Sequence, residues 1–353
     1  MLNLTFPTNY ELDKVVQDYV AQTENFIGAQ ILPETTSDFQ VVRWDERDRD
    51  RGMTAPHVMG TDPKTDTRQG SKTREYTPIP FKETDLLRED EILRQRELGT
   101  INQTLDLSRE IARIAKNRLD KTRIRMEKLR WDTLKGSISI NENGVKVSET
   151  FDVQDHSLST GWDVLNSATP VKDFDALALK FKGTGASAAG AVAYMARKTA
   201  NLLTENTNAN DLKGFQNSNF LQLAYSIEEL NKILSTRGLP TVYVYDEGYI
   251  DENDDFVNFL DYGEVVVVGK RPGGEKVGDW CSTPSMHRQV NGRFAGGYFS
   301  IIEVNGQPSA AVGGVSMSQL GESKNPKIEV TGGIYGGTRL IYPSNVISFN
   351  VLD

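Results

Sequence analysis

The feature that most constrains the fold is an uninterrupted amphipathic segment at residues 101–135. Apolar or small side chains recur there in steps of three, four and seven, the spacing of one face of a helix. They are Ile101, Leu105, Ala112, Ala115, Leu119, Thr122, Met126 and Leu129. At about 1.5 Å per residue such a helix would be roughly 50 Å long. Because Gly136 is a suitable C-terminal stop, the segment predicts one long helix ending there.

This segment is basic within an acidic protein. Residues 108–136 carry ten Lys or Arg against four Asp or Glu, whereas the whole chain has a net charge of −9. Acids gather in one strip (Asp106, Glu110, Asp120, Glu127), and bases recur at intervals of seven (Arg109, Lys116, Arg123, Arg130 and Lys121, Lys128, Lys135). The mixed polar side disfavours a membrane-surface helix, and a single aromatic residue, Trp131, disfavours stacking on nucleic acid. Two interpretations remain: a solvated helix with neighbouring salt bridges, and a beam whose charge strips meet those of adjacent copies.

Length and composition exclude several classes of protein. At 353 residues the chain exceeds the usual size of one core, so two lobes or one large domain with extensions are expected. A single cysteine, Cys281, excludes an internal disulfide and a thiolate zinc cage. No apolar run approaches the roughly 20 residues that span a bilayer, and the first residues lack a signal-peptide pattern. We therefore expect a cytosolic chain without membrane segments.

Before the long helix the sequence predicts extended structure. Residues 10–22 read as a short helix, Ile31-Leu32-Pro33 as an extended arm and residues 39–44 as a strand. Residues 45–80 alternate charges, are rich in Gly, Pro and Thr, and contain almost nothing to bury. This stretch is too long for an ordinary connection. It is either a flexible linker or a two-stranded projecting loop that is ordered only on another subunit.

After the long helix, residues 137–153 read as two strands joined by a hairpin turn at Asn143-Gly144. Residues 166–310 look like a separate α/β lobe, with a helix around residues 187–206 and buried strands at 239–247 and 262–271. Ser226 and Glu229 form a capping box for a further helix, which Gly238 would end. Residues 327–353 alternate like a sheet, and their distance along the chain would not prevent pairing with residues 137–153.

One motif suggests a nucleotide site. Gly183, Gly185 and Ala188 satisfy a relaxed dinucleotide-binding pattern between a possible strand and the predicted helix. The acid expected about 20 residues further on is missing in context, because Glu205 lies in an Asn-rich loop. A glycine turn capping an Ala-rich helix is the favoured interpretation. An α/β nucleotide-binding enzyme using the Gly183–Gly185 loop is the alternative.

Other candidate sites are weaker. Asp251, Asn253 and Asp255 begin like a calcium loop, but Phe256 and Tyr262 occupy the positions that need Gly and Glu, so an acidic surface loop is predicted. The histidines, His57, His156 and His287, lie in unrelated segments, which disfavours a metal site or histidine catalysis. Cys281 is predicted to be a packed thiol. We therefore expect no enzyme activity, cofactor or metal.

The order of the segments is the last feature. FIGAQILPETTSDFQVVRWD precedes residues 45–80, the long helix and LKGSISINENGVKVSETFDV. WDVLNSATPVKDFDALALKF, FVNFLDYGEVVVVGKRPGG and GGIYGGTRLIYPSNVISFNVL follow. Over nearly the whole chain this order resembles the major capsid proteins of tailed double-stranded DNA phages. Within them it is similar to the lambda-like branch of major capsid protein E, which has the Hong Kong 97-type capsid fold.

The resemblance implies an α+β fold with named parts. Residues 1–44 would be the N-terminal arm, 45–82 the extended loop, 83–165 the peripheral domain with its spine helix at about 101–135, 166–310 the axial domain, and 311–353 return strands to the peripheral domain. It also implies a structural protein that self-assembles into the hexamers and pentamers of an icosahedral head enclosing DNA. The location implied is the virion, after assembly in the host cytoplasm.

The resemblance also implies partners and contact residues. No long charged helical region precedes the arm in this sequence, so a separate scaffolding protein or a removed prodomain is expected, beside a portal and a decoration protein. Packaged DNA would be contacted only non-specifically, since the subunit is acidic. Candidate inter-subunit contacts are Trp44, Asp45, Arg47, Arg49, Arg51, Arg68, Lys72 and Arg74. Candidate inward-facing bases are Arg109, Lys116, Arg123 and Arg130.

Overall fold

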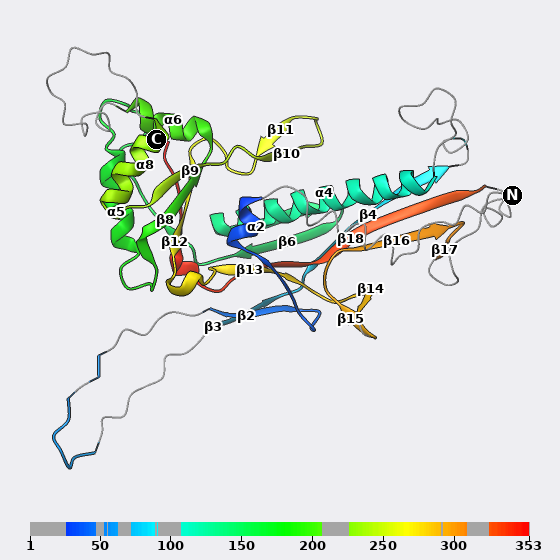
Figure 1. Ribbon diagram of the computed structural model, residues 1–353, viewed down its shortest axis with the longest axis horizontal. Helices are drawn as coiled ribbons and strands as arrows, with labels where there is room; N and C mark the ends of the chain where they lie inside the picture. The colour runs from blue at the N-terminus through cyan, green and yellow to red at the C-terminus, as the bar shows by residue number, and fades with distance from the viewer. Residues whose placement is uncertain are drawn as a thin grey trace.

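The protein is an elongated α+β molecule with two sheets side by side (Figure 1). The computed structural model describes residues 26–46, 53–54, 56–62, 72–88, 90, 107–206, 226–290, 292–308 and 325–352. The predicted helix at residues 10–22 therefore lies outside the described residues. Among the described residues, no helix is long and apolar enough to span a membrane.

The long predicted helix is present as α4, Leu107–Lys135. Residues 101–106 lie outside the described part of the chain. Ala115, Leu119, Met126 and Leu129 are buried as predicted. The helix ends where expected, because Gly136 adopts φ +105° and its N–H donates to the carbonyls of the preceding turn at 3.1 Å. A backbone in this left-handed region favours glycine.

α4 packs along the first sheet, which has six strands (Figure 1). Its order is β1 (Glu34–Thr36), β13 (Gly278–Ser282), β18 (Lys327–Leu340), β16 (Phe299–Val304) and β17 (Gln307–Pro308), with β4 (Ile79–Arg88) also paired to β18. The β4–β18 register runs antiparallel from Ile79 opposite Gly336 to Arg88 opposite Lys327. β18 is the central strand and is largely buried along its length.

The second sheet has five strands and its own core. Its order is β7 (Gln154–Asp155), β19 (Val346–Asn350), β12 (Glu264–Lys270), β8 (Ser187–Met195) and β9 (Thr241–Val244). Helices α5 (Pro170–Lys180), α6 (Arg197–Glu205) and α8 (Ile227–Thr236) gather around it (Figure 1). Trp162, Phe174, Leu177, Val265 and Phe349 are buried together between these layers.

The chain crosses between the two sheets twice in its C-terminal half. One crossing runs from β12 to β13 through η2 (Pro272–Gly274), and the other from β18 to β19 through η4 (Pro343–Asn345). The Arg271 guanidinium ties the crossings together, because it lies 3.3 Å from the Tyr342 ring centroid and donates to Glu275 at 2.7 Å. β19 falls in the range expected to return to the first sheet, yet it pairs with β12 of the second.

Short two-stranded ribbons complete the fold. They are β2 (Val42–Glu46) with β3 (Lys72–Tyr76), β5 (Ser137–Glu142) with β6 (Val145–Thr150), β10 (Gly248–Ile250) with β11 (Phe256–Asn258), and β14 (Ser285–Val290) with β15 (Arg293–Ala295). The hairpin turn predicted at Asn143-Gly144 is confirmed, with φ +48° and +79°. The pairing considered between residues 327–353 and 137–153 is not seen among the described strands, where β5 and β6 pair with each other.

Three predicted elements are wrong. Residues 187–195 form the strand β8 rather than the start of a helix. Their small side chains suit a central strand, since Ala191 and Ala193 are buried beneath helices and tertiary packing overrides propensity. The possible strand before Gly183 is instead helix α5, which runs from Pro170 to Lys180. Ile31 ends the short helix α2 (Ile27–Ile31) rather than lying in an extended arm.

Other details match the prediction. The capping box at the start of α8 is confirmed, with the Ser226 side chain accepting from the Glu229 N–H and the Glu229 side chain accepting from the Ser226 N–H. Gly238 follows the helix with φ +71°. The predicted strands at 239–247 and 262–271 contain β9 and β12. The strand predicted at 39–44 begins later, at Val42.

Candidate functional site

The ribbon β2–β3 brackets the long charged stretch and forms its base. The two strands pair antiparallel, with Val42 opposite Tyr76 and Glu46 opposite Lys72. The Trp44 ring is buried between Tyr76, edge-on at 5.8 Å, and Phe151, stacked at 6.1 Å between centroids. The chain therefore leaves the main body of the subunit along β2 and returns to it along β3, and the two strands are paired. This confirms a two-stranded base for the loop and contradicts the flexible-linker interpretation at residues 45–46 and 72–76.

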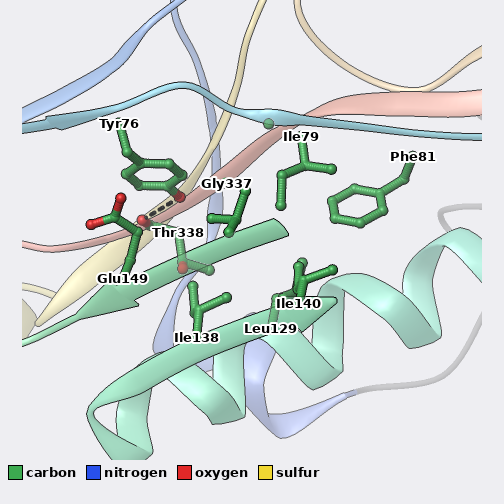
Figure 2. Close-up of a pocket in the computed structure, with 11 residues that line it drawn as sticks. Tyr76, Ile79, Phe81, Leu129, Ile138, Ile140, Glu149, Gly337 and Thr338 are labelled. Atoms are coloured by element: carbon green, nitrogen blue, oxygen red, sulfur yellow. Dashed lines mark hydrogen bonds between the residues drawn. The ribbon is translucent and has the colours of Figure 1, made fainter. Parts of the chain in front are cut away.

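Tyr76 fastens this ribbon to the central strand. Its hydroxyl donates to the Thr338 carbonyl at 2.9 Å (Figure 2). Gly337 makes the approach possible, because a Cβ there would lie 1.9 Å from the Tyr76 hydroxyl oxygen. Burial raises the pKa of Tyr76, so the phenol stays protonated and able to donate. An apolar hollow beside it is lined by Ile79, Phe81, Leu129, Ile138 and Ile140 (Figure 2).

Charges reinforce the base from outside. Lys72 and Arg74 reach the Asp152 carboxylate at 2.6 and 2.8 Å, and Arg74 also pairs with Glu46 at 2.5 Å. Hydrogen bonds from Lys72 and Arg74 lower the pKa of Asp152 below its ordinary value. These partners all belong to one subunit. Lys72 and Arg74, predicted as contacts between subunits, are thus engaged within their own subunit.

The Asp152 contact predicts a pH dependence. Because its folded pKa is lower than its unfolded pKa, the carboxylate stabilises the fold above the unfolded value, and this contribution is lost as pH falls through the folded value. We expect wild type to be more stable than Asp152→Asn near pH 7 and the difference to shrink in acid below the ordinary Asp range. Urea unfolding at several pH values measures this. A difference independent of pH would contradict the assignment.

The far end of the charged stretch exposes apolar side chains. Met53, Val58 and Met59 are all exposed. A turn forms there, since the Thr61 N–H and hydroxyl both bond the Val58 carbonyl, at 3.2 and 2.8 Å. In Figure 1 this blue segment lies far from both sheets. These side chains therefore find no burial within their own subunit.

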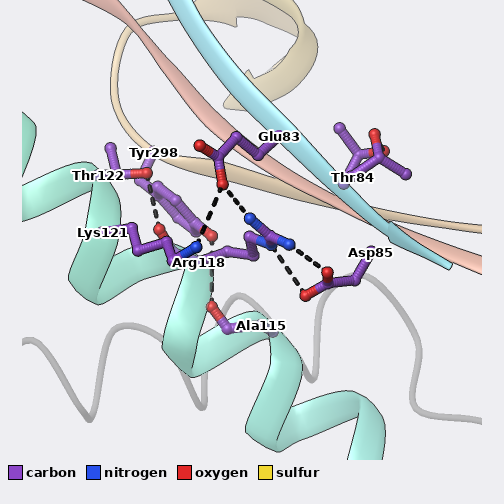
Figure 3. Close-up of polar contacts among 9 residues, drawn as sticks. Glu83, Thr84, Asp85, Ala115, Arg118, Lys121, Thr122 and Tyr298 are labelled. Carbon is purple, nitrogen blue, oxygen red and sulfur yellow. Dashed lines mark hydrogen bonds and ion pairs between the residues drawn. The ribbon is translucent and has the colours of Figure 1, made fainter. Parts of the chain in front are cut away.

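The basic side of α4 is matched by acids of the first sheet. The Arg118 guanidinium, with Nε 2.9 Å from Asp85, forms ion pairs with both Glu83 and Asp85 on β4 (Figure 3). Lys121 lies 3.8 Å from Glu83. The Tyr298 hydroxyl donates to the Ala115 carbonyl at 3.4 Å from the other side. Much of the basic character of α4 therefore holds the helix on its own sheet.

We expect Arg118 and Asp85 to be energetically coupled. A double-mutant cycle with Arg118→Ala and Asp85→Ala should give a coupling of about 1 kcal/mol, because Arg118 is mostly buried while Asp85 is partly exposed to solvent screening. The control cycle uses Arg43 and Glu75, a similarly close but exposed pair at 2.6 Å, whose coupling should stay below about 0.5 kcal/mol. Equal couplings in the two cycles would refute the role given to Arg118.

A buried carboxylate joins three parts of the fold. Glu127 on α4 accepts hydrogen bonds from the Gly28 N–H at 2.7 Å, the Trp131 indole at 3.0 Å and the Tyr245 hydroxyl at 2.9 Å. Arg130 lies 3.6 Å away. Burial raises the pKa of Glu127, and burial lowers the pKa of Arg130. The cluster ties α2, α4 and the start of the β10 segment to each other.

The close approach of α2 needs glycine. A Cβ on Gly28 would lie 2.7 Å from both carboxylate oxygens of Glu127. This cluster was not predicted from the sequence, in which Glu127 belongs to a strip of acidic residues. It also proposed Arg130 as an inward-facing base, which is wrong because the side chain is buried. A local signal was present, because Trp131 and Leu134 are apolar but lie outside the regular apolar face of α4. Both are buried, so this end of α4 is enclosed on all sides.

The remaining predicted contact residues divide into groups. Trp44 is part of the core, which corrects its prediction as a surface contact. Asp45 is exposed and accepts from the Thr73 hydroxyl at 2.6 Å. Lys116 is exposed and Arg123 half-buried on α4. Arg47, Arg49, Arg51 and Arg68 lie outside the described residues, as does the side chain of Arg109.

The geometry opposes the nucleotide-site alternative. Gly183 and Gly185 lie in the turn between helix α5 and strand β8. A dinucleotide loop needs the reverse order, a strand followed by a helix whose N-terminus faces the phosphates.

Asp251, the first residue of the possible calcium loop, accepts hydrogen bonds from the N–H groups of Asn253 and Asp255, both at 2.9 Å, and so forms a turn. Within the described residues no cluster of His, Cys, Asp and Glu is arranged to hold a metal.

Cys281 is buried, as predicted. Burial raises the pKa of its thiol, which keeps it protonated and weakly reactive. His156 is buried against Phe349, with 5.2 Å between ring centroids. His287 lies beside Phe299 at 4.9 Å. The three histidines, all within the described residues, do not form a cluster with one another or with acidic residues that could hold a metal ion.

Several solved structures share this fold. A prophage protein of Escherichia coli CFT073 assigned to the capsid matches with 12% identity, 99% of this chain, 100% of that chain and a TM-score of 0.59. A phage-related protein from Bordetella bronchiseptica RB50 matches with 13% identity, 99% of this chain, 98% of that chain and a TM-score of 0.52. The capsid of a native GTA particle matches with 11% identity, 94% of this chain, 92% of that chain and a TM-score of 0.52. No curated protein matches.

The fold class is therefore that of viral capsid subunits of the Hong Kong 97 type. A family model described as phage major capsid protein E matches residues 8–277. The chain belongs to this family of phage major capsid proteins. Its role is structural, in the capsid of the virion, where subunits of this kind self-assemble into shells. The resemblance inferred from the order of the segments is confirmed.

Proposed function

We propose that this capsid protein forms hexamers and pentamers of an icosahedral head that encloses double-stranded DNA. The loop held by the β2–β3 ribbon supports the proposal most. Its base is anchored by Trp44 and Tyr76, whereas Met53, Val58 and Met59 at its far end are exposed. Apolar side chains held away from their own subunit are suited to burial on a neighbour. The loop therefore extends the area through which one copy binds the next.

The division of the chain follows from this proposal. Residues 1–44 serve as the N-terminal arm, 45–82 as the extended loop, 83–165 as the peripheral domain, 166–310 as the axial domain and 311–353 as return strands. The second sheet and its helices have a buried cluster of their own, and two further clusters lie along α4 and the first sheet, the larger of which also includes Val266 and Val346. The β18 strand lies in the first sheet with α4, as a return strand to the peripheral domain would, whereas β19 pairs with β12 of the second sheet.

Charged residues of the loop are proposed contacts with neighbours. Asp45 begins this group, Arg47, Arg49 and Arg51 alternate with acidic residues from Glu46 to Asp50, and Arg68 lies further along the loop sequence. Each exposed ion pair contributes little, but a shell repeats it many times. Modest individual contacts also allow misplaced subunits to dissociate during assembly. Lys72 and Arg74 instead fix the loop base through Asp152.

Other components are proposed from the family. A separate scaffolding protein would guide closure, a portal would occupy one vertex, and a decoration protein would bind outside, with assembly in the host cytoplasm. The net charge of −9 supports weak, non-specific contact with packaged DNA. Arg109, Lys116 and Arg123 on α4 are the remaining candidates for such contact.

Replacing residues 53–70 with a short Gly-Ser linker tests the role of the loop. We expect wild-type protein to form shells or capsomers in analytical ultracentrifugation, and the variant to remain small at the same concentration. The midpoint temperature of thermal unfolding should be close to that of wild type. The substitution spares the β2–β3 ribbon and the buried clusters, none of which includes residues 53–70. If the variant assembled as well as wild type, the loop would not be the main contact.

A further inference from the structure

Two projecting hairpins carry opposite charges. Residues 248–258, which form the β10–β11 hairpin, include four acidic residues (Asp251, Glu252, Asp254 and Asp255) and no basic residue. Residues 285–295, which form the β14–β15 hairpin, include Arg288, Arg293 and His287 and no acidic residue. We call them the acidic hairpin and the basic hairpin. Within the described part of the chain, neither hairpin forms a salt bridge through these residues.

The acidic hairpin has an inner and an outer face. Tyr249 points inward, with its ring 6.0 Å from the Lys128 ammonium of α4 and 6.0 Å from the Phe259 ring. Ile250 and Phe256 are directly opposite each other in the ladder, so they share the other face. They are 68% and 61% exposed. The outer face therefore presents an apolar pair beside a cluster of carboxylates.

The basic hairpin also exposes apolar side chains. Met286 is 79% and Phe294 52% exposed, and Val290 is exposed opposite Arg293. A two-stranded hairpin is at best marginally stable in water without a surface to pack on. One side of the ribbon is held by its own subunit, with His287 beside Phe299 and Arg288 donating to the Tyr298 carbonyl at 3.1 Å, so its exposed apolar side chains would gain from a partner on the other side. The complementary partner would carry acidic and apolar groups together.

The two hairpins cannot meet within one subunit. Figure 1 shows the acidic hairpin on one side of α4 and the basic hairpin on the opposite side, beyond the six-stranded sheet. A surface that fits a different surface on an identical copy gives a head-to-tail contact, and such contacts close into rings when the rotation allows. The base of the extended loop, β2–β3, lies on the same side as the basic hairpin in this view.

We propose that the acidic hairpin of one subunit docks on the basic hairpin of the next subunit in the ring, burying Ile250 and Phe256 against Met286 and Phe294. The occupant of each hairpin is thus a second copy of this chain. Charge complementarity sets the direction of the contact, and the apolar pairs supply its buried area. The inference rests on the proposed ring assembly and identifies one of its contacts.

Crosslinking tests the contact directly. We would place cysteines at Phe256→Cys and Phe294→Cys in one chain and treat assembled particles with a short bismaleimide. The expected product is a ladder of covalent oligomers up to the ring size on a denaturing gel. The native Cys281 is buried, so wild type should give no ladder. The control pair is Leu179→Cys with Phe294→Cys, because Leu179 is exposed on α5, away from both hairpins.

A second pair, Ile250→Cys with Met286→Cys, covers the case in which the first variant fails to fold. Particles that form normally but give no ladder with either pair would overturn the proposal. If wild type formed no particles at all, the ring assembly itself would fail, and sedimentation of the unmodified protein reveals that case separately. Glu252→Lys with Asp255→Lys should also raise the concentration for half-assembly by about tenfold. Asp175→Lys, an exposed charge reversal on α5, should leave it unchanged.

Discussion

Replacing Glu127 with alanine is expected to lower the free energy of unfolding of the subunit by about 3–5 kcal/mol, because it leaves a buried partner charge uncompensated. The substitution removes the acceptor for the Gly28 N–H, the Trp131 indole and the Tyr245 hydroxyl. It also leaves Arg130 buried without its nearest carboxylate. Urea unfolding followed by tryptophan fluorescence, at concentrations below assembly, measures the loss.

The matched control is Glu142→Ala. Glu142, at the end of strand β5, is exposed and pairs with Arg125 of α4 at 2.8 Å. Its removal should therefore cost less than about 1 kcal/mol. A similar small loss for both variants would show that the Glu127 cluster does not hold α2 against α4. The expected result would show that the cluster holds the N-terminal segment to α4, beside the separate hydrogen bonds that Thr35 makes to Asp279 and Trp280.

Replacing Trp44 with alanine is expected to destabilise the subunit by about 3–5 kcal/mol, the usual cost of deleting a buried large aromatic side chain. Trp44 is packed between Tyr76 and Phe151, so the cavity would open at the base of the extended loop. Hydrogen exchange should then show faster exchange in β2 and β3. The free energy of unfolding is measured by urea titration at concentrations below assembly.

Phe39→Ala is the control for Trp44→Ala, because Phe39 is also aromatic and close in sequence but 77% exposed. Its effect on unfolding should be within about 0.5 kcal/mol. If Trp44 acted as a contact between subunits, Trp44→Ala would have a different effect. In that case the isolated subunit would keep its stability and only assembly would weaken.

The local elements of this fold were largely readable in the sequence. The long helix has a regular apolar face and a glycine stop, and both signals are contained in neighbouring residues. The Asn143-Gly144 turn and the Ser226–Glu229 capping box are likewise short-range patterns with a direct structural cause. The order of such elements was sufficient to identify the family.

The buried polar cluster was not readable, because its partners are distant in sequence. Gly28 is 99 residues from Glu127, and Tyr245 is 118 residues from it. An acid on a helix is usually solvated, and the local signal, the two further apolar residues Trp131 and Leu134, does not reveal which distant groups meet Glu127. Trp44 was misplaced for a related reason. It lies at the edge of a charged stretch, and its burial depends on Phe151 from a separate ribbon.

Strand β8 shows the limit of residue propensity. Alanine-rich segments favour helices, yet Ala191 and Ala193 lie in a strand between β12 and β9. Small side chains are needed there because helices cover the sheet closely. The error also created the apparent dinucleotide loop, since the predicted helix supplied the context for the glycines. Correcting the strand removes the basis for that alternative.

Electron microscopy of purified wild-type protein tests most directly whether this chain builds shells. We expect closed particles in which the segment containing Val58 and Met59 rests on a neighbouring subunit. Single subunits under every concentration and salt condition, or particles in which that segment folds back on its own subunit, would contradict it.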